Sequence, residues 1–172
     1  MLETLKQLLT NQYAAALCTL NACIDRCPEA AWNAPVGNLA FCQVVFHTIF
    51  YADYYLGPGE RGFRDQLFHR THPGFFRDYE ELEDRVPVLL YDRPMIKSYL
   101  EHCHHKAVDV IAKESAESLA GSSGFERRTF SRAELHVYNI RHIQHHAAQL
   151  SLRLRLDFGE SISWFGSGWR DR

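Results

Sequence analysis

Residues 131–159 read SRAELHVYNIRHIQHHAAQLSLRLRLDFG and decide the fold expected of this chain. Ser131 followed three residues later by Glu134 is a capping box, a pattern typical of a helix start. Apolar residues recur from there to about Leu156, and Gly159 is a suitable helix end. The stretch therefore predicts one long helix that carries two histidines, His142 and His146, near its middle.

Three other long helices are expected upstream of this one. Apolar residues at helical spacing fill residues 2–27 until Pro28, and a second helix should begin at Asn38 as its N-cap and end at Leu56. A third should run over residues 92–114, because Asp92 is a suitable cap and a proline follows in the first turn. With no strand alternation and no repeat, residues 1–172 predict a single all-α domain, a four-helix bundle.

Residues 57–93 form a long connection with glycines, prolines and little periodicity. Its aromatic residues would be stranded in water by a solvated loop, so we expect part of it to pack across the functional end of the bundle or against a second subunit. They are Phe63, Phe68, Phe75, Phe76 and Tyr79. In the C-terminal tail, we expect Trp164 to pack back onto the bundle.

Charge and composition exclude several classes of partner. A net charge of -2 with both signs interspersed favours a small-molecule or protein partner and predicts no nucleic-acid contact. Residues 38–56 contain no Lys or Arg, but Gln43, His47 and Asp53 are costly in hydrocarbon, so we expect a buried helix and no membrane partner.

Cysteine usage and the first residues bear on location. The five cysteines form no CxxC pair, so neither disulfides nor a cysteine zinc site are expected. The opening MLETLKQLL has an acidic residue and no apolar block before a small-residue cleavage site, so it does not predict a secretory signal. A cytoplasmic location is expected.

The histidines suggest a metal site. At about 100° per residue, His142 and His146 lie about 40° apart on one helix face, one turn from each other. Gln149 follows one turn later, and the facing helix offers His47 as a third imidazole. Three histidines leave a coordination position open for water or substrate, as in catalytic zinc sites, and imidazoles suit Zn, Ni, Co, Cu or Fe. The sequence therefore predicts one divalent transition metal held by His47, His142 and His146.

Other polar residues are candidates for supporting roles around this site. Gln43 and Tyr51 lie one turn on either side of His47, and they or Gln149 could orient a ligand or the substrate, with core packing as the alternative. The remaining histidines are expected elsewhere: His136 exposed, and His69 in a solvated loop. No Asp or Glu is placed as a general base, and no catalytic residue is predicted.

The segment RHIQHHAAQL, with His142 and His146 four residues apart and Gln149 after them, resembles the signature of the DinB-like superfamily of metal-dependent enzymes. In that family a histidine in the middle of the second helix is the third ligand, and His47 in FHTIFYADYYL matches it. The helix spacing is similar over essentially the whole chain. One departure is Ala147-Ala148, where relatives often have Arg-Gly.

The resemblance implies a four-helix bundle with a non-sequential helix order and a long crossover connection, a Zn or Ni ion at one end, and a homodimer. It also implies a low-molecular-weight thiol as one class of substrate, because characterised relatives include thiol-dependent S-transferases and an isomerase. We therefore expect a metal-dependent transferase or hydrolase acting on a small molecule. The alternatives are a non-catalytic metal- or ligand-binding bundle and a helical interaction protein with buried histidines.

Overall fold

The computed structural model describes residues 1–77, 79–83 and 85–170, and in this part of the chain the fold is all-α apart from one small hairpin. Four helices are long: α1 (Leu2–Arg26), α2 (Phe41–Leu56), α5 (Arg93–Lys113) and α7 (Arg132–Phe158). Each begins and ends within a few residues of the bounds expected from the sequence.

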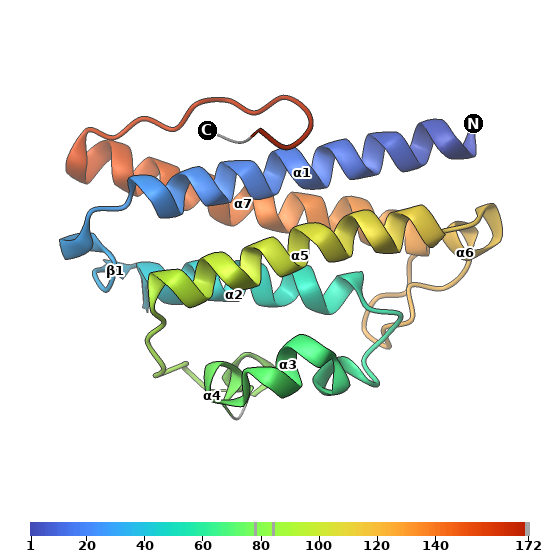
Figure 1. Ribbon diagram of the computed structural model, residues 1–172, viewed down its shortest axis with the longest axis horizontal. Helices are drawn as coiled ribbons and strands as arrows, with labels where there is room; N and C mark the ends of the chain where they lie inside the picture. The colour runs from blue at the N-terminus through green and yellow to red at the C-terminus, as the bar shows by residue number, and fades with distance from the viewer. Residues whose placement is uncertain (78, 84, 171–172) are drawn as a thin grey trace.

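Each of the four long helices packs against two of the others. Helix α1 contacts α5 and α7, and α2 contacts the same two helices, so α1 and α2 lie diagonally opposite each other. Figure 1 shows α2 and α5 running in one direction and α1 and α7 in the other. Helices α2 and α5 can be parallel because the long connection between them carries the chain back along their length.

Local sequence determines the helix ends. The Asp92 carboxylate accepts a hydrogen bond from the Met95 N–H at 2.8 Å, and the Ser131 hydroxyl accepts one from the Glu134 N–H at 3.2 Å, as predicted. Gly159 ends α7 with a φ of 69°, a left-handed conformation that glycine adopts without strain.

The start of α2 differs from the prediction. The cap is Ala40 and not Asn38, because β1 (Pro35–Val36) and β2 (Leu39–Ala40) pair as an antiparallel hairpin that takes up the residues before the helix. The Ala40 N–H then donates to the side chain of Gln43 at 2.8 Å. Thus a side chain from inside the first turn satisfies the backbone donor that starts α2.

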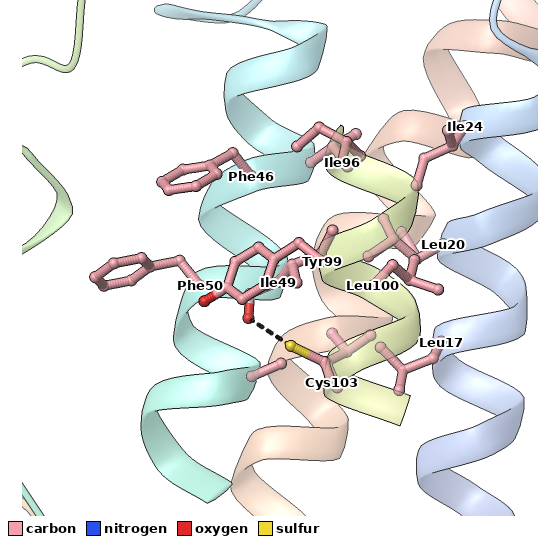
Figure 2. Packing of buried hydrophobic residues seen from close by; sticks show 14 of the residues in the cluster. Leu17, Leu20, Ile24, Phe46, Ile49, Phe50, Ile96, Tyr99, Leu100 and Cys103 are labelled. Atoms are coloured by element: carbon pink, nitrogen blue, oxygen red, sulfur yellow. Dashed lines mark hydrogen bonds between the residues drawn. The ribbon is translucent and has the colours of Figure 1, made fainter. Parts of the chain in front are cut away.

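The core lies between the four long helices (Figure 2). Leu17, Leu20 and Ile24 of α1 meet Ile96 and Leu100 of α5. All five are at least 98 % buried, and each contributes about 1.5–3 kcal/mol by leaving water. Within the described residues, none of the helices combines the length and the apolar character that a membrane span requires.

The connection between α2 and α5 is folded. It contains η2 (Phe63–Asp65), α3 (Leu67–Thr71), α4 (Pro73–Phe76) and η3 (Glu80–Leu82). Phe63, Phe75 and Phe76 are buried, and their rings contact Phe46 and Phe50 of α2 and Tyr99 of α5. The aromatics thus pack on the outer side of α2 and α5, along the helices.

A buried polar cluster fastens this connection to the long helices. The Asp53 carboxylate of α2 accepts hydrogen bonds from His69 at 2.7 Å and from Tyr99 at 2.8 Å, and it pairs with Lys106 of α5. His69 is 2 % exposed, so its expected position in a solvated loop was wrong. The aromatic residues around it bring α3 onto the bundle and bury its imidazole against Asp53.

The remaining elements are short. They are η1 (Glu29–Ala31) after α1 and α6 (Ala116–Ala120) before α7. The C-terminal tail returns along α1, but the expected contact of Trp164 is wrong, since that side chain is 82 % exposed. Phe165 packs in its place against Ala15, Cys18 and Ala22 of α1. The small side chains there leave room for one ring.

Candidate metal centre

His47, His142 and His146 come together between α2 and α7. Each offers one ring nitrogen, and these atoms lie within 4.8 Å of one another. The His47 and His142 Nε2 atoms are 3.5 Å apart, and the His47 ring centre lies 4.8 Å from that of His146. All three side chains are half-buried. They lie near the middle of both helices and not at one end of the molecule, where the resemblance implied the ion.

Glu81 of η3 holds the His47 ring from outside. Its Oε2 lies 2.7 Å from His47 Nδ1, and its main-chain carbonyl accepts a hydrogen bond from the Tyr51 hydroxyl at 2.7 Å. With Nδ1 donating to the carboxylate, the Nε2 lone pair of His47 points away from Glu81. The Tyr51 ring centre is 4.9 Å from that of His47.

No pattern in the sequence points to Glu81. It lies in the long connection, more than 30 residues from His47, and helical periodicity says nothing about such a segment. The aromatic residues of the connection were the available signal, because their burial brings η3 against α2. A carboxylate often supports a metal-binding histidine, so an acidic residue of this connection is a natural partner for His47.

Gln149 supports the second histidine of α7. Its Oε1 lies 2.9 Å from His146 Nδ1, and its amide nitrogen lies 3.1 Å from His145 Nε2. If His146 Nδ1 carries the proton, Nε2 is free to act as a ligand. His142 Nδ1 is buried and has no hydrogen-bond partner among the described residues.

The surroundings keep two of these imidazoles neutral. Burial, followed by the nearby rings of His146 and His47, lowers the pKa of His142 to about 3. Burial is also the largest cause that lowers the pKa of His146, to about 4, against the opposing hydrogen bond with Gln149. Both rings are therefore uncharged at neutral pH and offer lone pairs.

Gln43 has a different role from the one predicted for it at the metal. Its Oε1 accepts from the Ala40 N–H, and its amide nitrogen donates to the carbonyls of Pro87 and Leu89 at 2.9 and 3.2 Å. Gln43 therefore joins the start of α2 to the end of the connection. Both ends of the amide are used, which leaves nothing for the histidines.

His136 was expected to be exposed, and that expectation is wrong. Its side chain is fully buried, with Nε2 3.1 Å from Glu114 and Nδ1 3.2 Å from the Tyr13 hydroxyl. It lies six residues, about 1.7 turns, before His142 on α7, and it contacts Tyr13 of α1. These contacts make it a buried polar link between helices and not a member of the three-histidine cluster.

A cavity of about 730 Å³ lies next to two side chains that contact His47, although none of the three histidines lines it. Tyr51 and Glu81, which both contact His47, form part of its wall. Farther along, its wall includes Tyr55, Phe125 and Arg128. A small molecule in this cavity would therefore lie against the side chains that hold His47.

Comparisons of this chain with protein-family models, with curated proteins and with solved structures gave no match.

Proposed function

We propose that this protein is a DinB-like, metal-dependent enzyme in which His47, His142 and His146 hold one divalent transition metal, Zn or Ni. The observation that carries the proposal is the meeting of three imidazole nitrogens within 4.8 Å, from two helices that are far apart in sequence. The order of contacts among the four long helices and the long crossover support a DinB-like bundle.

The donor set fits such an ion. Two nitrogens bound to one Zn at about 2.05 Å with tetrahedral angles lie about 3.3 Å apart, close to the 3.5 Å between the His47 and His142 Nε2 atoms. Metals bind neutral imidazole, and the pKa values of about 3 and 4 make His142 and His146 neutral at pH 7. Hydrogen bonds at Nδ1 hold the His47 and His146 rings in place.

A bound metal would lower the pKa of a coordinated water or thiol, or polarise a substrate oxygen. The chain itself supplies orientation. Glu81 Oε2 holds His47, while Glu81 Oε1 is buried and has no hydrogen-bond partner among the described residues. Glu81 also lines the cavity, so a substrate bound there would lie beside the residue that orients His47.

The proposed reaction is transfer of a low-molecular-weight thiol to a small molecule, or hydrolysis, and we further propose a homodimer in the cytoplasm. The thiol and the dimer rest on the resemblance of the histidine motif. A ligand set of three histidines supports catalysis, because it leaves a position for a reactant.

The alternative is a non-catalytic module that stores or senses a metal or a small molecule. A screen separates the two: Zn-loaded and Ni-loaded protein is incubated with low-molecular-weight thiols and small electrophiles or esters, and adducts and hydrolysis products are followed by mass spectrometry. An enzyme gives product that disappears in His142→Ala. If metal-loaded wild-type protein forms no more product than His142→Ala with any of the thiols, electrophiles or esters, the protein is a non-catalytic binding module.

A further inference from the structure

Two series of aromatic rings lead away from the histidines, one on α2 and one on α7. On α2, His47, Tyr51 and Tyr55 follow one another at successive turns, with ring centres 4.9 and 5.7 Å apart. On α7, Tyr138 lies one turn before His142, and its ring centre is 5.4 Å from that of Tyr55. Eight residues of helix separate His47 from Tyr55, which is about 12 Å.

Arg128 lies at the end of these two series of rings that is farthest from the histidines. Its Nη2 donates to the hydroxyls of both Tyr55 and Tyr138 at 3.1 Å, and the guanidinium lies 5.0 Å from the centre of the Tyr138 ring. These contacts fix the orientation of the guanidinium. Its Nη1 donates to the main-chain carbonyl of Arg127 at 3.3 Å. Among the described residues Arg128 has no carboxylate partner, and its Nε–H is buried without an acceptor.

The cavity of about 730 Å³ extends from Tyr51 and Glu81, which contact His47, to Arg128. We propose that the substrate is an elongated monocarboxylate, whose carboxylate binds Arg128 while its reacting end lies beside His47, His142 and His146. The inference rests on the proposed function, because it uses the metal centre as the reacting end. An oriented guanidinium attracts a carboxylate through its charge and through the Nη1 proton that Arg127 does not use, and the tyrosine rings offer apolar faces to the chain between the two ends.

Acidic residues also line the cavity, and they help to define the ligand. Glu81 is paired with His47, and Glu83 with Arg85. Glu60 and Glu126 are exposed near the equally exposed Arg127, where water and salt weaken their fields. A phosphate dianion would be repelled by these carboxylates more strongly than a carboxylate would, so a single negative charge fits the site better.

The test uses ω-mercaptoalkanoates of increasing chain length and the matching ω-mercaptoalkanols, titrated calorimetrically into Zn-loaded and metal-free protein. Short acids and alcohols should bind alike, and acids long enough to reach Arg128 should bind about tenfold or more tightly than their alcohols. Arg128→Gln should abolish this preference and leave Zn content and alcohol affinity unchanged. Arg127→Gln, the control on the exposed neighbour, should retain it.

Equal affinity of acids and alcohols at every length in Zn-loaded protein would overturn the inference, and so would an equal loss of preference in both arginine variants. The comparison of acids with alcohols in wild-type protein tests the inference even if Arg128→Gln does not fold. Elemental analysis separates the two proposals: protein that binds no metal refutes the proposed function, whereas the acid preference of metal-free protein still reports on Arg128.

Discussion

At the scale of single residues, the site depends on side chains that orient the imidazoles. Glu81 holds His47 through Nδ1, and Gln149 does the same for His146. Both partners leave Nε2 as the nitrogen available to a metal. The metal affinity of this protein should therefore depend on residues that would never touch the ion.

Replacing Glu81 by Gln tests this dependence. The amide preserves the size of the side chain and removes the negative charge beside His47, so metal affinity should fall about 10-fold or more. Titration of Zn against a competing chelator at pH 7 measures the change. Glu83→Gln, two residues away and exposed, is the matched control. If Glu81→Gln and Glu83→Gln bind Zn with equal affinity, the Glu81 carboxylate has no role in metal binding.

The low pKa values of His142 and His146 make a second prediction, for metal-free protein. Their pKa values are about 3 and 4 when folded, against about 6.5 in the unfolded chain, so the unfolded state binds more protons between pH 6.5 and 4. The free energy of unfolding should accordingly fall as pH is lowered through this range. His142→Asn removes one of these groups and should reduce the slope.

Urea unfolding in the presence of chelator at four pH values from 7.5 to 4.5 measures this slope. His145→Asn is the control, because His145 is the exposed neighbour on α7. If the free energy of unfolding depends on pH in the same way for wild type and His142→Asn, the fold does not hold His142 neutral.

At the scale of elements, the connection between α2 and α5 matters most. It supplies Glu81 to the site, and the cluster around Asp53 fastens it. Burial raises the pKa of Asp53, but the hydrogen bond from His69 and the charge of Lys106 outweigh burial and hold the pKa at about 2. The carboxylate is therefore ionised, and it pairs with a cation that is itself largely buried.

Asp53→Asn should destabilise the protein by about 3 kcal/mol or more, because it leaves Lys106 buried without its charged partner. Urea unfolding at pH 7 measures this, and Asp109→Asn on the exposed side of α5 is the control. Amide hydrogen exchange should also rise in η2 and α3. A loss below about 1 kcal/mol, with exchange unchanged, would mean that the aromatic contacts alone hold the connection.

At the scale of the whole molecule, sequence patterns predicted what depends on local chemistry. Ser131 and Asp92 started their helices as expected, and the spacing of His142 and His146 placed them on one face. What could not be predicted depends on contacts between distant segments. Glu81 and His69 acquire their partners only because aromatic residues fold the connection onto α2, and no periodic pattern marks such a contact.

The helix α7 shows the same limit in a smaller way. The spacing of His142 and His146 predicts the face of α7 that meets α2, and His136 falls on the side expected to meet water. The structure places α1 there, and Tyr13 and Glu114 give His136 its hydrogen bonds. A single helical wheel cannot show which of its faces a second neighbour will cover.

The proposed function requires that three histidines from two helices hold one metal ion per chain. Elemental analysis of protein loaded with Zn and then freed of excess metal by gel filtration tests it most directly, for wild type and for the single Ala variants of His47, His142, His146 and, as control, His104. His104 stacks on Trp169 of the tail and takes no part in the cluster. We predict about one Zn per chain in wild type and His104→Ala, and loss of most of it in each of the other three. Zn-free wild type, or equal occupancy in all four variants, would contradict the account.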